Sequence, residues 1–162
     1  MKPRIYVETS VISYLAARPS TDAVNAARQY HSMQLWLAKS KFDLSLSTLV
    51  IDEMSEGNET AVIRRLDFAK EIALVTMPDN SAWIADALVA SKALPEIAYA
   101  DGLHIACAAI LKFDVIASWN FRHIASIWAR NKIIACLNEL GVHAPTIATP
   151  EEILESFNDQ HE

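Results

Sequence analysis

Five short apolar runs, each separated from the next by helical sequence, constrain the fold of this chain most. They occupy residues 5–7, 42–46, 72–75, 115–117 and 146–148. Runs of this length that end at polar or turn residues are typical of strands. Strands that alternate with helices favour a parallel sheet with helices on both faces. The sequence therefore predicts an α/β fold with a short-stranded, mainly parallel sheet.

The intervals between these runs carry helical periodicity with start and stop signals. Helices are expected over 11–17, 22–39, 48–57, 58–70, 80–93 and 99–112, over an interval ending at 140, and from 150 onward. Thr9 or Ser10 is expected to cap the first helix, and Gly141 to end the helix that precedes it. Thr149, followed by Pro150 and two acids, is typical of a helix start.

Length and composition agree with one folded domain. The chain has 162 residues, of which 52% are hydrophobic and 21% charged, with 3 Gly and 6 Pro. These values exclude a disordered or collagen-like chain, and the length allows a core without disulfides. Cys107 and Cys136 lie in apolar helical sequence and are expected to be buried free thiols. No apolar run reaches the about 18 residues of a membrane span, and Glu8 comes too early for a signal peptide. A cytoplasmic protein without membrane association is therefore expected.

Polar residues stand where two of the predicted strands end. Glu8 follows the first strand directly, and Asn120 lies just after the fourth. Parallel strands of such folds bind ligands at the edge where their carboxyl ends lie, so both side chains are expected there. The sequence contains no Gly-rich phosphate loop and no H-E-x-x-H, C-x-x-C or G-x-S-x-G motif. The commonest nucleotide-binding, zinc, redox and serine-hydrolase signals are therefore absent.

The remaining candidates are carboxylates at the starts and ends of elements: Glu8, Glu53 and Asp101, with Asp52 beside Glu53. Carboxylates from separate elements can hold Mg²⁺ and activate water against a phosphodiester. Glu53 and Asp101 also have structural interpretations, because Glu53 lies in an acidic helix face and Asp101 can favour a helix dipole. Glu8 is harder to explain structurally, because a partly buried carboxylate after an apolar strand needs a partner. A lone histidine such as His104 is more often a packing residue than a ligand.

Four segments in order along the chain resemble the PIN-domain family, many members of which are VapC-type toxins of bacterial toxin–antitoxin pairs. They are IYVETSVISYL at 5–15, LSTLVIDEM at 46–54, YADGLHIACA at 99–108 and DVIASWNFRHI at 114–124, and the ending IATPEEIL at 147–154 fits the family too. The resemblance spans nearly the whole chain. It implies a three-layer α/β/α sandwich and a Mg²⁺- or Mn²⁺-dependent endoribonuclease that hydrolyses RNA phosphodiesters with metal-activated water.

The resemblance also assigns a site, position by position. The implied catalytic residues are Glu8, Glu53, Asp101 and Asn120, the implied metal ligands are Glu8, Glu53 and Asp101, and the implied substrate-binding residues are Thr9, Ser10, Ser118 and Arg122. The chain departs from the family twice, since the family usually has Asp at the position of Glu8 and often at that of Asn120. Glu8 adds a methylene, and Asn120 can offer a carbonyl oxygen but no charge, which favours one metal over two. Trp119 is expected in the core.

The partners implied by the resemblance are an RNA substrate, a cognate antitoxin that brings a cation to the acidic site, and a second copy in a homodimer. Residues 1–150 are expected to form the PIN-like domain, with 151–162 as an acidic helix or tail of the same domain. The two departures leave open a catalytically weakened PIN-fold module that binds RNA or protein. A phosphatase acting on small phosphoesters would share the site chemistry and stays open as well.

The distribution of charge keeps an RNA substrate compatible with an acidic chain. The formal net charge of −6 by itself argues against a basic nucleic-acid-binding module. Residues 151–162 carry five acids and no Lys or Arg, which leaves 15 acids against 14 bases elsewhere. Without the three implied metal ligands, 12 acids face 14 bases. RNA recognition is therefore expected to rest on local contacts rather than on a broad basic surface.

Overall fold

A computed structural model, which describes residues 1–159, contains one five-stranded sheet whose strands are all parallel. The strands are β1 (Arg4–Val7), β2 (Asp43–Ser47), β3 (Ala73–Val75), β4 (Val115–Ala117) and β5 (Thr146–Ala148), in the spatial order β3-β2-β1-β4-β5. Each strand agrees with a predicted run to within one residue at either end. Glu162 of the predicted acidic tail lies outside the described residues.

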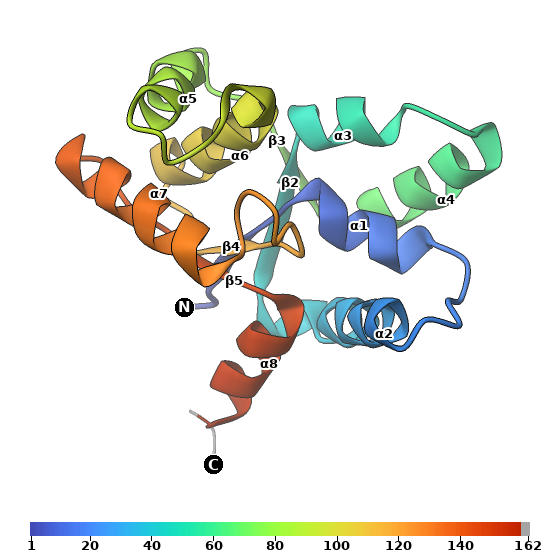
Figure 1. Cartoon of the computed structure of the whole chain (residues 1–162). Coiled ribbons are helices and arrows are strands. Elements are labelled where there is room, and N and C mark those ends of the chain that lie inside the picture. Colours follow the sequence, from blue (N-terminus) through green and yellow to red (C-terminus); the bar gives the residue numbers. More distant parts are fainter. Residues whose placement is uncertain (160–162) are drawn as a thin grey trace.

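Helices cover both faces of this sheet. They are α1 (Thr9–Ala16), α2 (Ala23–Leu37), α3 (Thr48–Met54), α4 (Glu59–Ala69), α5 (Ser81–Ala90), α6 (Tyr99–Ile110), α7 (Ile127–Glu139) and α8 (Pro150–Asp159), with the 3-10 helices η1 (Lys39–Lys41) and η2 (Glu96–Ala98). α5, α6 and α7 lie on one side, and α1, α2, α4 and α8 on the other (Figure 1). The expected three-layer α/β/α sandwich is confirmed, with a sheet that is entirely parallel. In this described part of the chain, no helix has the length and apolar character to cross a bilayer.

The central strand β1 determines which residues meet at the edge of the sheet. It pairs with β2 on one side and with β4 on the other. Ile5, Tyr6 and Val7 are all 0% exposed, as expected for a strand that is covered on both faces. The register places Val7 opposite Ala117, and the amide of Glu8 donates to the carbonyl of Ala117 over 3.1 Å. The start of α1 therefore lies directly beside the loop that follows β4.

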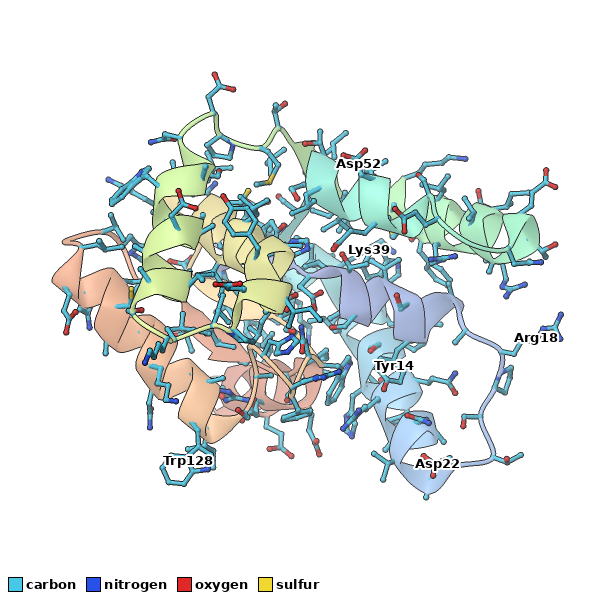
Figure 2. The ribbon with its side chains drawn as sticks, turned by 45° about the horizontal axis from the view of Figure 1, so that its top comes forward. Tyr14, Arg18, Asp22, Lys39, Asp52 and Trp128 are labelled. Atoms are coloured by element: carbon cyan, nitrogen blue, oxygen red, sulfur yellow. The ribbon has the colours of Figure 1, made fainter. Side chains whose placement is uncertain are left out.

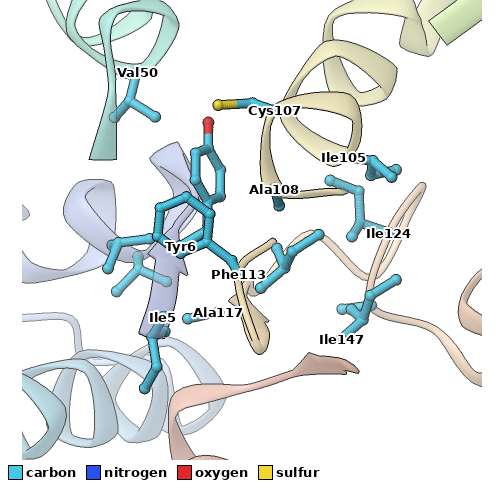
Figure 3. Packing of buried hydrophobic residues seen from close by; sticks show 14 of the residues in the cluster. Ile5, Tyr6, Val50, Ile105, Cys107, Ala108, Phe113, Ala117, Ile124 and Ile147 are labelled. Atoms are coloured by element: carbon cyan, nitrogen blue, oxygen red, sulfur yellow. The ribbon is translucent and has the colours of Figure 1, made fainter. Parts of the chain in front are cut away.

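The core fills the space between β1 and the helices around it. Tyr6 extends from β1 between Val50 of α3 and Cys107 of α6 (Figure 3). Cys107 and Cys136 are buried free thiols, as predicted. Burial raises the pKa of the Cys107 thiol to about 12, so this cysteine stays protonated at neutral pH.

Several helix ends agree with the sequence signals, but the start of α1 does not. Gly141 has a φ of +69° just after α7, which is the expected left-handed stop. At α1, however, Glu8 occupies the N-cap position and makes no capping hydrogen bond with its side chain. The prediction that Thr9 or Ser10 caps this helix is wrong, because their hydroxyls donate to the carboxylates of Glu53 and Glu8 instead.

The last helix, α8, is stabilised by hydrogen bonds in its first turn. Thr149 and Glu152 form a capping box: Thr149 Oγ1 accepts from the Glu152 amide over 3.2 Å, and the Glu152 carboxylate accepts from the Thr149 amide over 2.7 Å. Glu152 also accepts two hydrogen bonds from Arg130 of α7, over 3.0 and 2.9 Å. Just before this turn, the carbonyl of Ala148 accepts from the amide of Ser118 over 3.1 Å. β5 and α8 therefore hold both α7 and the loop after β4.

Thr149→Ala should lower the free energy of unfolding by about 1 kcal/mol, the usual loss for an N-cap hydroxyl. Thr149→Ser keeps the hydroxyl and should keep most of the stability. Urea unfolding measures both, and the midpoint should fall without a change in slope. Equal losses in the two variants would show that the methyl group, not the capping bond, stabilises this turn.

Candidate active site

Three predicted acids reach the carboxyl edge of the sheet from three different elements. Glu8 follows β1, Glu53 lies in α3 after β2, and Asp101 lies in the first turn of α6. The helix that precedes a parallel strand starts at the carboxyl edge, because it must return the chain to the opposite edge. Asn120 lies at the same edge, in the loop that follows β4.

Glu8 is a buried carboxylate held by hydroxyl groups. It is 5% exposed, and its Oε2 accepts from the hydroxyls of Ser10 and Ser118, the latter over 2.8 Å. Burial raises the pKa of Glu8 above its ordinary value, and a nearby imidazole and the two hydroxyls oppose that rise. The serines also organise the neighbouring loop: Ser10 Oγ accepts from the Trp119 amide over 2.9 Å, and Ser118 Oγ from the Asn120 amide over 3.0 Å.

A chain of hydrogen bonds connects Glu53 to the buried sheet. Its Oε1 accepts from the Thr9 hydroxyl and from Nε2 of His104, which lies 2.6 Å away. An ionised carboxylate only accepts, so Nε2 carries a hydrogen. Nδ1 of His104 lies 2.6 Å from the Tyr6 hydroxyl, which lies 2.8 Å from the hydroxyl of Ser47. His104 is fully buried, whereas the side chain of Glu53 is 33% exposed.

His104 is the electrostatic centre of this network. Burial by itself lowers the pKa of a histidine, but the hydrogen bond to Glu53 and the charges of Glu8, Glu53 and Asp101 raise the pKa of His104 above its ordinary value. Partial burial would raise the pKa of Glu53, yet His104 and Thr9 together bring it below its ordinary value. All three carboxylates thus act on one imidazole, although they come from separate parts of the chain.

Asp101 uses both of its carboxylate oxygens. Nδ2 of Asn120 donates to Oδ1 over 3.1 Å, and Nδ1 of His123 donates to Oδ2 over 2.9 Å. Oδ1 of Asn120 accepts from the amide of His123 over 3.1 Å. Because a backbone amide can only donate, this bond identifies the oxygen end of the Asn120 side chain. Asn120 therefore turns the NH₂ group of its side chain toward Asp101, and not the carbonyl oxygen that was expected to face a metal.

The network brings together most of the predicted site residues, namely Glu8, Thr9, Ser10, Glu53, Asp101, Ser118 and Asn120. Arg122 stays apart: it is exposed and, within residues 1–159, donates no hydrogen bond to these carboxylates. Asp52 lies on the outer side of α3 and is exposed (Figure 2). Trp119 is 6% exposed, and its indole N–H donates to the Ser32 hydroxyl over 2.8 Å, so its prediction as a core residue is confirmed.

Sequence reasoning missed the buried half of the network. Tyr6 and Ser47 lie inside strands, where an aromatic and a small residue are ordinary. Nothing in the sequence therefore indicated that they form a chain of hydrogen bonds with His104. His104 did carry one, because it lies three residues after Asp101 and hence on the same helix face. It is a packing residue with satisfied hydrogen bonds, as expected, but one of those bonds is to Glu53.

The oxygen donors suit a hard divalent cation, although the side chains are bonded to one another. Among residues 1–159, no group of three or more His, Cys, Asp or Glu side chains is arranged to hold a metal ion. Mg²⁺ usually takes one or two carboxylates and keeps several waters. Glu53 and Asp101, with side chains 33% and 17% exposed, meet solvent, whereas Glu8 at 5% is almost fully covered. The donor chemistry therefore fits Mg²⁺ or Mn²⁺, with Glu53 and Asp101 as the accessible pair.

The chain is similar to known proteins in family and in fold. Residues 5–125 match the family model described as PIN domain, and this range includes all three carboxylates and Asn120. The crystal structure of VapC20 from Mycobacterium tuberculosis, described as a Sarcin-Ricin loop cleaving toxin, matches with a TM-score of 0.54 and 16% sequence identity. The match covers 73% of this chain and 91% of that one. At this identity the likeness concerns the fold. No curated protein matches the sequence significantly.

Glu8→Gln should stabilise the metal-free protein at neutral pH, by about 0.5–2 kcal/mol, the usual range for stabilising substitutions. A folded-state pKa above the ordinary value of about 4.3 means that stability falls as the pH rises through the interval between the two values. Ionised Glu8 therefore lowers stability at pH 7, and a neutral amide of the same shape removes that penalty. Urea unfolding in EDTA at pH 4 and pH 7 should show a gain that is larger at pH 7.

Glu152→Gln supplies a control of opposite sign. Partial burial would raise the pKa of Glu152, but Arg130 and the Thr149 amide bring it below its ordinary value. Its contribution to stability is therefore present at neutral pH and is lost as the pH falls through the lowered pKa. This variant should be less stable than the parent at pH 7. Destabilisation by Glu8→Gln at pH 7 would contradict the account given for Glu8.

Proposed function

Because the chain belongs to the PIN domain family, we propose that it is a metal-dependent endoribonuclease. The observation that carries this proposal is that Glu8, Glu53 and Asp101, from three separate elements, lie in one group of hydrogen-bonded side chains at the carboxyl edge of the sheet. The likeness of the fold to VapC20, described as a Sarcin-Ricin loop cleaving toxin, supports RNA as the substrate class.

Each acid has its own positioning residues in this proposal. Ser10 and Ser118 orient Glu8, His104 orients Glu53, and the loop after β4 orients Asp101. Glu53 and Asp101 would hold Mg²⁺ or Mn²⁺ from the solvent side, with the buried charge of Glu8 behind them. When bound, such an ion polarises a scissile phosphate and lowers the pKa of a water molecule.

The loop after β4 would serve the substrate as well as Asp101. Asn120 acts as a positioning residue in this scheme, because its amide group donates to Asp101 and its oxygen is used by the backbone. Arg122 follows in the same loop, is exposed, and is available for a phosphate. Thr9, Ser10 and Ser118 would orient water or phosphate once their carboxylate partners turn toward an ion.

The biological setting proposed is that of a bacterial toxin paired with an antitoxin. An antitoxin would block the acidic edge by supplying a cation there, which the net negative charge of the three carboxylates favours. We further propose a cytoplasmic homodimer in which residues 1–150 form the catalytic domain and 151–162 belong to the same domain. The packing of α8 against α2 and beside β5 supports the assignment of residues 151–162 to the same domain.

Asp101→Asn should reduce RNA cleavage by more than the roughly 10–100-fold typical of a residue that merely supports a metal ligand. EDTA should abolish cleavage, and Mg²⁺ or Mn²⁺ should restore it. Asp52→Asn is the matched control, because Asp52 is an exposed acid beside Glu53 and should be silent. Cleavage that survives both EDTA and Asp101→Asn would overturn the proposal.

The same assay separates the two alternatives. RNA that is bound but not cut with any divalent ion would indicate a binding module with weakened catalysis. Turnover of p-nitrophenyl phosphate without turnover of RNA would indicate a phosphatase.

Asn120→Asp should make the protein depend on metal for its stability. The new carboxylate oxygen would replace the amide that now lies 3.1 Å from Asp101 Oδ1, so two like charges would face each other. In EDTA the variant should lose roughly 1–4 kcal/mol, the Coulomb energy of such a pair between water and a protein surface. Mn²⁺ should recover this loss, and calorimetry should show tighter Mn²⁺ binding than in the parent. Equal Mn²⁺ affinity in parent and variant would place the ion away from residue 120.

A further inference from the structure

A pocket of about 540 Å³ lies between the end of α5 and the start of α7, beside the acidic edge. Its volume is within the range of about 300–1,000 Å³ that is usual for ligand sites. The ionisable and aromatic side chains that line it are Lys92, Glu96, Arg122, His123, Trp128 and Lys132. His123 belongs to both regions, because it lines the pocket and donates to Asp101 over 2.9 Å. The pocket is therefore adjacent to the proposed catalytic carboxylates.

The charge of this pocket is opposite to that of the whole chain. Lys92, Arg122 and Lys132 contribute three positive charges against the single negative charge of Glu96, while the chain carries −6 in all. All three cations are exposed, and in the part of the chain that the structure describes none of them takes part in an ion pair. Their charges are thus available to an anion from solution.

An exposed indole stands at the same place. Trp128, in the first turn of α7, is 77% exposed and projects away from the molecule (Figure 2). An exposed indole beside unpaired cations is the combination that binds single-stranded nucleic acid, since the ring stacks on a base and the cations neutralise phosphates. An acidic protein segment would match the lysines but has no group that requires an aromatic platform.

We propose that this pocket binds a nucleotide of the RNA strand next to the one that is cleaved. Lys92 and Lys132 contact its phosphates, and Trp128 stacks on its base. A strand that passes the Asp101 carboxylate would reach the pocket through Arg122 and His123, which lie two and three residues after Asn120. This inference rests on the proposed ribonuclease function, and it adds a binding site for the part of the substrate next to the cleaved nucleotide.

The test measures RNA binding without cleavage. The probe is a fluorescein-labelled single-stranded RNA of eight nucleotides, added to the full chain in EDTA, with anisotropy recorded over a range of salt concentrations. The variants are Lys92→Gln, Lys132→Gln and Trp128→Ala. None of these residues is hydrogen-bonded to the carboxylates of the proposed site.

The chain offers a matched control for each kind of variant. Lys112 is also exposed and also has a left-handed backbone, with a φ of 55° against 60° for Lys92, but it follows the far end of α6. Lys112→Gln therefore reproduces any backbone effect of Lys92→Gln away from the pocket. Trp83 is 43% exposed near the opposite end of α5, so Trp83→Ala controls for the loss of a surface indole.

Trp128→Ala should weaken binding by roughly 5- to 150-fold, the contribution of stacking on one base. Each lysine variant should reduce the slope of log affinity against log salt by about 0.7, as for one phosphate contact on a single strand. The Lys112 and Trp83 variants should bind like the parent. Parent-like binding by all three pocket variants would overturn the pocket proposal, while RNA cleavage by the parent would leave the ribonuclease proposal standing.

Two further outcomes would also overturn the pocket proposal. If the parent binds no RNA and cuts none, both proposals fail together. If a polyglutamate peptide binds with the same sensitivity to the three variants while the RNA does not bind, the pocket is a docking site for an acidic protein segment.

Discussion

A single buried imidazole makes the acidic edge of this sheet possible. Three carboxylates near one another repel, and Glu8 has in addition been taken almost completely out of water. His104 counters both effects, because it donates a hydrogen bond to Glu53 and, when protonated, attracts the other two acids as well. Its own position is set by the Tyr6 hydroxyl, which projects from the most deeply buried strand. The arrangement of the site thus follows from a contact made inside the core.

In this arrangement, some groups hold the site in shape and others remain accessible to solvent. The hydroxyls of Ser10 and Ser118 bind Glu8 and also receive the amides of the loop after β4, so the central strand and that loop are fixed relative to each other. Glu53 and Asp101 stand further out and reach solvent. A site of this kind keeps its shape in the core while leaving two carboxylates free to exchange hydrogen-bond donors for other partners.

The sequence predicts the sheet and the positions of the acids well, because both depend on short-range patterns. Strands of three to five residues between helices leave few alternatives to a parallel sheet, and polar residues after strands then fall at one edge. The roles of Thr9 and Ser10 were predicted wrongly as helix caps, since their acceptors include Glu53, 44 residues from Thr9. The bond between Tyr6 and His104 joins residues 98 positions apart, and the orientation of Asn120 depends on one backbone amide. Local sequence contains neither fact.

The hydrogen bond from the Ser118 amide to the Ala148 carbonyl has a consequence for truncating this protein at the end of the family match. The family match ends at residue 125, yet Ser118, which orients Glu8, donates its amide to a strand that comes more than twenty residues later. A fragment cut at the family boundary would strip β5 from β4, leaving the backbone of Val115–Ala117 as an open sheet edge beside buried apolar side chains. Such a piece would tend to self-associate before it could arrange its acids. The family match therefore ends before the sheet is complete.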